Sequence, residues 1–313
     1  SAVVLTRSET YWDAQAVKLP SATFYLGRED PKGEFLDGKS DCCQLSYEDL
    51  ERLDAKKFSY EARENTLWTL TFNQAAQRQG LDDVRVRRAL VGALDLSGVP
   101  QRVSDRYAAA DSLVISDAVL FQEHYEDLIS SPARNIGYRP QEAKAWLDEY
   151  RGAEGEVSGL TLILPQSADL AALGGYFQKL WKDHLLLYVN LEILPDSEYR
   201  SRLTSGDYTL ALVSMASTAE GPQGTLASHF TAGSANVSRF SDGEYDQLLS
   251  RALTAGQASA AAECYRQAEE YLLQNAVALP LFTESSYYAV GKGVSGVEFE
   301  ENGGVYLKNA SRT

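Results

Sequence analysis

An α/β fold arranged in two domains or lobes is the architecture that the sequence predicts, on three observations. The chain has 313 residues, which is more than one compact hydrophobic core usually holds. Apolar residues make up 44 % of the sequence, enough to bury a core. Strand-like and helix-like segments alternate along the chain, a pattern typical of βαβ units and mixed sheets.

Up to residue 96, short apolar runs are separated by turn signals. The β-branched and aromatic character of some runs predicts strands, and helical spacing of apolar residues predicts helices. The strands expected here are residues 3–5, 22–26 and 65–73, and the helices are residues 47–57 and 80–96. Asp82 or Asp83 can cap the last of these helices. The face of that helix expected to be buried carries Val86, Leu90, Ala93 and Leu94.

Residues 98–137 show no clean period, and the elements become distinct again at Pro140, which suits the first turn of a helix. Ser167 is placed to cap a helix that runs to about Asp183. Strands are expected over 159–164, 188–193 and 208–214, with an extended segment over 276–282 and short strands after 291. Further helices are expected over 198–203, 242–254 and 257–275.

Composition excludes several classes of partner. The formal net charge of −15 repels phosphate backbones and anionic lipids, so neither nucleic acid nor a membrane surface is expected to bind. No apolar run is long enough for a membrane-spanning helix, and residues 1–5 lack the basic start and long apolar run typical of a signal peptide. The abrupt strand-like start suggests a piece of a longer protein, with any membrane anchor in the absent N-terminal part.

Catalytic and metal-binding patterns are missing, so we expect no enzyme, no cofactor and no metal site. The chain has three histidines, and the contexts of His124 and His184 favour a solvated face and a helix end. No nucleophile elbow, zinc-binding helix or phosphate loop occurs. Adjacent Cys42 and Cys43 do not suit a bridge with each other, and nothing requires either to pair with Cys264.

An ordered set of segments resembles the oligopeptide, dipeptide and nickel-binding family (family 5) of extracellular solute-binding proteins of ABC transporters. The strongest is Leu-Thr-Phe-Asn at 70–73 followed by the helix DDVRVRRALVGALD at 82–95. Weaker matches, in family order, are residues 10–13, 19–24, 35–41, 138–147, 160–193, 240–249 and 278–282. Several of these have their own physical reason as helix caps and core faces, so they indicate a fold more than a ligand.

The resemblance implies a type II periplasmic-binding-protein-like α/β fold, with one complete lobe and part of the other. The expected divisions are 1–73 for the partial first lobe, 74–282 for the second lobe and 283–313 for the return to the first. It also implies an extracytoplasmic, non-catalytic binder, typically anchored as a lipoprotein, that captures a peptide or related solute between two lobes for an ABC transporter permease. A sensor or scaffold with the same fold is one rival interpretation, and a hydrolase is another.

The segment at 208–222 resembles the family strand that ends at the ligand. Peptide binders carry there a Trp and an Asp that pairs with the peptide's ammonium group, and the matching positions here are Met215 and Thr218. A neutral hydroxyl cannot balance an ammonium charge. The ligand-binding candidates are therefore Met215, Ser217, Thr218, Glu220, His229 and Phe230. Equally, Met215 can belong to the core and Thr218 to an ordinary loop.

Overall fold

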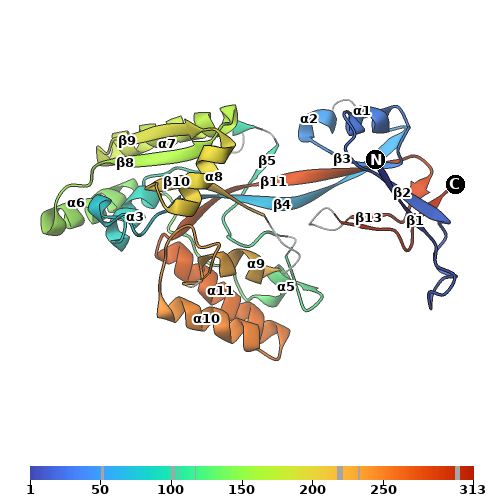
Figure 1. The fold of residues 1–313 in the computed structure, drawn as a ribbon. Helices are drawn as coiled ribbons and strands as arrows, with labels where there is room; N and C mark the ends of the chain where they lie inside the picture. Colours follow the sequence, from blue (N-terminus) through green and yellow to red (C-terminus); the bar gives the residue numbers. More distant parts are fainter. Residues whose placement is uncertain are drawn as a thin grey trace. The chain divides into compact units, whose positions relative to one another are not determined.

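The chain divides into two compact units, each built from segments distant in sequence. Unit 1 comprises Ser1–Asn65 and Ser285–Thr313, and unit 2 comprises Thr66–Glu284. The computed structural model describes residues 1–50, 53–99, 103–104, 106–116, 118–216, 221–231, 233–299 and 304–313. Strands β4 (Phe58–Phe72) and β11 (Ala278–Gly291) contribute residues to both units (Figure 1).

Unit 1 is a small α/β unit whose core forms on one face of β3, β4 and β11. Strand β3 (Cys42–Leu45) pairs antiparallel with the C-terminal part of β11, and Phe35, Leu45, Tyr287 and Ala289 are buried together. The other elements are β1 Ala2–Thr6, β2 Ser21–Tyr25, α1 Pro31–Leu36, α2 Tyr47–Leu50, β12 Val294–Ser295, β13 Glu298–Phe299, β14 Val305–Tyr306 and β15 Ser311–Arg312.

Unit 2 is a mixed sheet covered by helices. Its strands follow the order β11, β4, β10, β8, β9, and β5 also pairs with β11. The elements are η1 Gln77–Gln79, α3 Val84–Gly92, β5 Tyr107–Ala109, β6 Val119–Leu120, β7 Glu123–His124, α5 Tyr125–Leu128, α6 Pro140–Glu154, β8 Leu160–Pro165, α7 Ala168–Leu185, β9 Val189–Leu194, α8 Asp196–Ser205, β10 Leu210–Ala216, α9 Pro222–Leu226, η2 Ala227–His229, α10 Gly243–Thr254 and α11 Ala258–Gln274.

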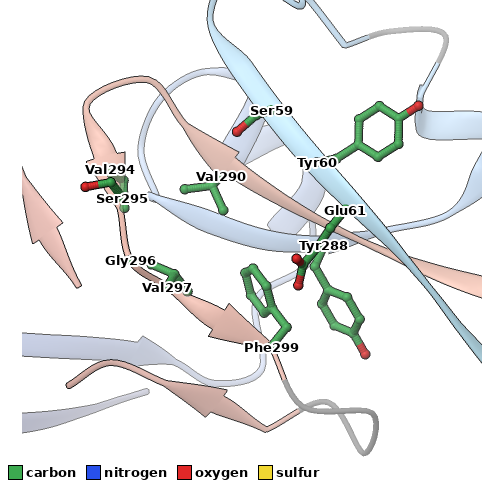
Figure 2. A pocket seen from close by; sticks show the side chains of 10 residues that line it. All are labelled: Ser59, Tyr60, Glu61, Tyr288, Val290, Val294, Ser295, Gly296, Val297 and Phe299. Atoms are coloured by element: carbon green, nitrogen blue, oxygen red, sulfur yellow. The ribbon is translucent and has the colours of Figure 1, made fainter. Parts of the chain in front are cut away.

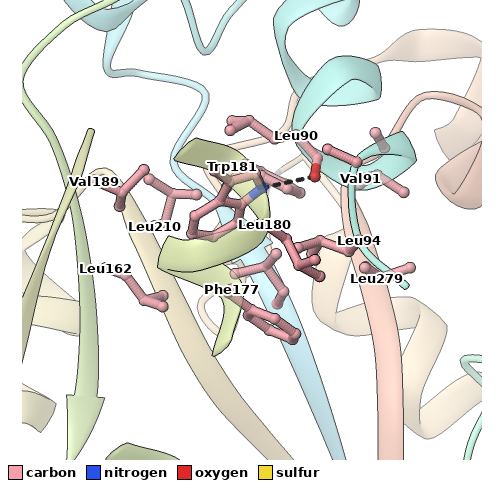
Figure 3. Packing of buried hydrophobic residues seen from close by; sticks show 14 of the residues in the cluster. Leu90, Val91, Leu94, Leu162, Phe177, Leu180, Trp181, Val189, Leu210 and Leu279 are labelled. Carbon is pink, nitrogen blue, oxygen red and sulfur yellow. Dashed lines mark hydrogen bonds between the residues drawn. The ribbon is translucent and has the colours of Figure 1, made fainter. Parts of the chain in front are cut away.

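Successive residues of the central strands enter different cores, because side chains alternate between the two faces of a sheet. Leu162 and Leu164 of β8 join the cluster that includes α3, α6 and α7, whereas Ile163 joins the cluster beneath α8. In the first cluster the indole N–H of Trp181 donates a hydrogen bond to the carbonyl of Leu90, 2.8 Å away (Figure 3). Because the indole is fully buried, this bond satisfies its only polar atom.

The predicted caps are present. The carboxylate of Asp83 accepts from the backbone N–H of Arg85 at 2.7 Å, so Asp83 rather than Asp82 caps α3. Ser167 caps α7, and Pro140 occupies the first turn of α6. These capping interactions involve only neighbouring residues, so they do not depend on how the rest of the chain folds.

Several element predictions were wrong in extent, among them the helix expected over 47–57 and the strand expected over 65–73. The helix expected over 47–57 exists only as α2, and residues 55–57 form a turn; residues 51–52 lie outside the described residues. Asp54 accounts for this, because its side chain accepts from Lys56 N–H and its carbonyl accepts from Phe58 N–H, which directs the chain into β4. Strand β4 accordingly starts at Phe58 rather than Asn65.

Candidate functional site

One edge of the unit 2 sheet gathers the carboxyl ends of several strands. Strands β8 and β9 run parallel to β10, and β10 runs antiparallel to β4 with Ala216 opposite Thr66. The ends of β8, β9 and β10 therefore share the edge at which β4 enters unit 2. In open α/β sheets, ligands bind outside this kind of edge. We call it the carboxyl edge.

The expected ligand residue Met215 stands at the carboxyl edge, one residue before the end of β10 and opposite Leu67. Its side chain is half-buried and packs against two hydrophobic clusters. The sulfur also lies 3.6 Å from the hydroxyl of Ser228, which follows α9. Met215 thus has the contacts of a core residue while keeping part of its surface accessible.

The loop candidates Ser217, Thr218 and Glu220 lie outside the described residues. On the far side of that segment, Pro222 begins α9 and Leu226 is fully buried. The assignment of the three loop residues to a ligand stays a prediction.

His229 is in the interior of unit 2, with only 2 % of its surface exposed. Its Nδ1 lies 3.4 Å from the Ser238 hydroxyl, and its Nε2 has no hydrogen-bond partner within the described residues. Burial lowers the pKa of His229 from 6.5 to about 4. The ring is therefore neutral near neutral pH, and it offers no cation to a ligand.

The neighbours of His229 form a polar network that shapes the chain after α9. The Ser238 hydroxyl donates to the side-chain oxygen Oδ1 of Asn236 at 2.8 Å, and the Asn236 side-chain amide donates to the backbone carbonyls of Phe230 and Phe240 at 3.2 and 2.7 Å. Phe230 itself is half-buried against a hydrophobic cluster. The structure therefore brings Met215, His229 and Phe230 into one region, where His229 and Phe230 mainly support the chain.

A charged cluster on unit 2 was missed by the sequence interpretation. Arg106 Nη2 lies 3.3 Å from an Asp169 carboxylate oxygen, and Arg106 Nε lies 3.9 Å from Glu284. The indole N–H of Trp68 donates to the other Glu284 oxygen at 3.3 Å. Arg106 also donates to the hydroxyl of Tyr107 and lies over its ring. We call Arg106, Asp169, Glu284 and Trp68 the edge cluster.

The edge cluster is positioned by backbone pairing at the carboxyl edge. Trp68 lies opposite Ser214 near the end of β10, and Glu284 pairs with Tyr107 between β11 and β5. Asp169 stands in the first turn of α7, directly after β8. A search for charged residues that follow strand ends would have found Asp169, but Arg106 lies in the segment with no readable period.

Glu269 of α11 is a second ionisable group, and the structure places it in the interior of unit 2. It is 1 % exposed, and one of its oxygens accepts from the Ser112 hydroxyl at 2.7 Å and from the backbone N–H of Leu113 at 2.8 Å. Burial raises the pKa of this carboxyl group, although the bonds from Ser112 and Leu113 act in the opposite direction. Glu269 therefore fastens the 112–114 turn to α11 from inside the protein.

Unit 1 contains a pocket with a volume of about 330 Å³ beside β4, β11 and residues 294–299. Figure 2 shows Tyr288 and Phe299 next to each other in it, and their rings stack with centroids 4.8 Å apart. Glu61 also lines the pocket, and its carboxylate lies 3.5 Å from Arg63 Nε. None of the ligand candidates lines this pocket.

The described residues contain neither a cluster of metal ligands nor a disulfide bond. No group of three or more His, Cys, Asp or Glu side chains there is placed to hold a metal ion. All three cysteines are free, and Cys42 and Cys43 are successive strand residues whose side chains point to opposite faces. Burial raises the pKa of Cys42 to about 11, which favours the protonated thiol over the thiolate near neutral pH. Among the described helices, none has the length and apolar character needed to cross a membrane.

Comparisons with known proteins agree with this architecture. The periplasmic oligopeptide-binding protein OppA of Haemophilus influenzae is 23 % identical over 318 residues, which cover 97 % of this chain and 57 % of that protein. The murein tripeptide binding protein MppA in its unliganded open form has a TM-score of 0.75 at 19 % identity, covering 100 % of this chain and 61 % of that one. For CtaP of Listeria monocytogenes the TM-score is 0.77 at 17 % identity, with 100 % and 64 % covered.

These solved structures establish the periplasmic-binding-protein fold, and the chain spans about 60 % of their length. Residues 1–236 match the middle region of one family of bacterial binding proteins. This match covers most of the sequence and includes β4, α3, the carboxyl edge and Met215. The chain belongs to the bacterial extracellular solute-binding proteins, family 5.

Proposed function

We propose that the protein to which this chain belongs is the extracytoplasmic solute-binding component of an ABC importer and that its solute is a peptide. The observation that carries the proposal is the carboxyl edge of unit 2, where strand ends, a half-buried methionine and a charged cluster lie together. Family membership supports it, and so do relatives whose printed names describe binding of oligopeptides and a murein tripeptide.

The protein in this proposal binds its solute without covalent chemistry. The described residues at the carboxyl edge supply hydrogen-bond donors, carboxylates and apolar surface, which are the means of binding. His229 is buried away from solvent, so it is not placed to act as a general base. The family resemblance is the basis for expecting that a second lobe encloses the peptide.

A thermal-shift screen of the full-length protein against short peptides, sugars and metal complexes tests the proposal. A ligand that binds only the folded state raises its stability by about 2.7 kcal/mol at 100 times the dissociation constant. Peptides are expected to raise the melting temperature, and sugars and metal complexes are expected to leave it unchanged. A shift with a sugar or metal complex and none with peptides would contradict the peptide assignment.

Two further observations separate transport from its rivals. Permease and ATPase genes next to the gene for this protein would favour an importer over a sensor or scaffold. Residues 1–313 alone are expected to bind peptides weakly, because contacts from the rest of the protein are lost while the cost of association remains. Tight, micromolar binding by this fragment in calorimetry would count against the enclosed-ligand part of the proposal.

A further inference from the structure

The hairpin formed by β6 and β7 in unit 2 presents an aromatic side chain on a turn that does not favour it. The strands pair up to Leu120 and Glu123, which leaves Phe121 and Gln122 as a two-residue turn. Both turn residues have positive φ, 52° and 69°. Turns of this kind usually contain Asn and Gly, because a Cβ atom disfavours positive φ. The Phe121 side chain is also 58 % exposed, so burial does not explain a phenylalanine at this position.

The base of the hairpin is fixed to the interior of unit 2. The N–H of Tyr125 donates to the carbonyl of Ala118 at 2.8 Å, and both residues are buried in the cluster that includes α10 and α11. Glu269 of α11 also holds the N–H of Leu113, a few residues before the hairpin. A contact residue on a fixed support loses little conformational entropy when it binds, which favours affinity.

The hairpin lies directly against the residue that follows the candidate ligand loop. This residue, Gly221, comes immediately after positions 217–220 and has φ +65° and ψ −144°, a conformation that only glycine adopts readily. A Cβ atom on Gly221 would lie 2.3 Å from the carbonyl oxygen of Val119 in β6. Glycine therefore allows β6 to pack against the start of α9, the helix that follows the carboxyl-edge strand β10 along the chain.

We propose that Phe121 contacts an apolar side chain of the bound peptide. The inference rests on the proposed function and specifies one contact of its site, and the ligand class is peptides with aliphatic or aromatic side chains. Val119, which is 42 % exposed, adds apolar surface to the same hairpin. Removal of the Phe121 ring from water on binding would offset the unfavourable turn and the exposure of the free protein.

Leu186 provides a matched comparison elsewhere in unit 2. It also has a positive φ, 54°, and its side chain is 70 % exposed. It lies between α7 and the first residue of β9, so it stands at the edge of the sheet opposite the carboxyl edge. The two residues share backbone conformation, exposure and apolar character, but only Phe121 belongs to a hairpin that packs beside the candidate ligand loop.

Competition between two tetrapeptide libraries tests the inference. One library has leucine and phenylalanine at its variable positions and the other has serine and asparagine, and the peptides that the full-length protein retains are quantified by mass spectrometry. The parent is expected to prefer the apolar library, and Phe121→Asn should reduce this preference about five- to tenfold, the size of one aromatic contact. Leu186→Asn should leave the preference unchanged. Asparagine tolerates positive φ, so both variants should melt at or above the temperature of the parent.

The outcomes separate this inference from the proposed function. Equal retention of the two libraries by the parent, an unchanged preference in Phe121→Asn, or an equal loss of both libraries in that variant would overturn the Phe121 contact without contradicting peptide binding. Retention of neither library by the parent would refute peptide binding and the inference with it. If Phe121→Asn fails to fold, Phe121→Gly, which also suits positive φ, replaces it and is judged by the same outcomes.

Discussion

Acid should destabilise unit 2 through the single buried histidine, His229. Its pKa is lowered from 6.5 to about 4 by burial alone, with no charged neighbour contributing. For a base whose folded-state pKa lies below its unfolded-state pKa, the unfolded chain binds the proton more readily. Stability is therefore complete above pH 6.5 and falls as the pH drops from 6.5 toward 4.

The size of the effect follows from the two pKa values. Each pKa unit corresponds to about 1.4 kcal/mol, so the full loss is about 3 kcal/mol, and about 2 kcal/mol of it is reached between pH 7 and pH 5. The group is 2 % exposed, so solvent screening does not reduce this figure substantially. A stability of about 5–15 kcal/mol is typical of a folded domain, and a loss of this size is easily measured.

Urea unfolding between pH 7 and pH 5, followed by intrinsic fluorescence, measures this loss. The variant His229→Gln lacks the titrating group and should lose about 2 kcal/mol less than the parent across this range. His124→Gln, at an exposed position, serves as the control and should behave like the parent. If the parent and His229→Gln show the same pH dependence, the buried imidazole is not the cause and the reasoning from burial fails.

Three other substitutions test the packing and the ligand loop. Arg87→Met should lower the free energy of unfolding by about 3–5 kcal/mol in urea titration. The reason is that the buried guanidinium donates to backbone carbonyls, including that of Asn275 at 3.0 and 3.1 Å. A loss below about 1 kcal/mol would contradict this role. Trp181→Phe should cost about 2–3 kcal/mol in the same assay, because it removes the bond to Leu90 and leaves a cavity; an unchanged midpoint would show that the core repacks. Thr218→Asp should improve binding of a free-amine dipeptide more than of its N-acetyl form, as titration of the full-length protein would show, and equal changes for both forms would place Thr218 away from the ligand amine.

Local chemistry explains why the sequence could predict many of the elements. Asp83, Pro140 and Ser167 act on backbone groups within one helical turn, so their effect does not depend on distant contacts. The periods of apolar residues in α3 and α7 likewise indicate the buried faces directly. The order of the family-like segments extended this local information to the fold, and the structural comparisons confirmed that prediction.

Long-range pairing decided what the sequence left open. The extended segment expected to end at Phe282 continues as β11 to Gly291, because its polar and aromatic residues pair with β5 and β3, which come from distant parts of the chain. The edge cluster arises in the same way, since Arg106, Asp169 and Glu284 come together only when their strands and helix are arranged around the sheet. By itself, the sequence determined the α/β class, the capped helices and the family resemblance. The tertiary structure decided that His229 is buried and that two carboxylates share one arginine. Burial and charge pairing of this kind depend on contacts between residues far apart in the chain.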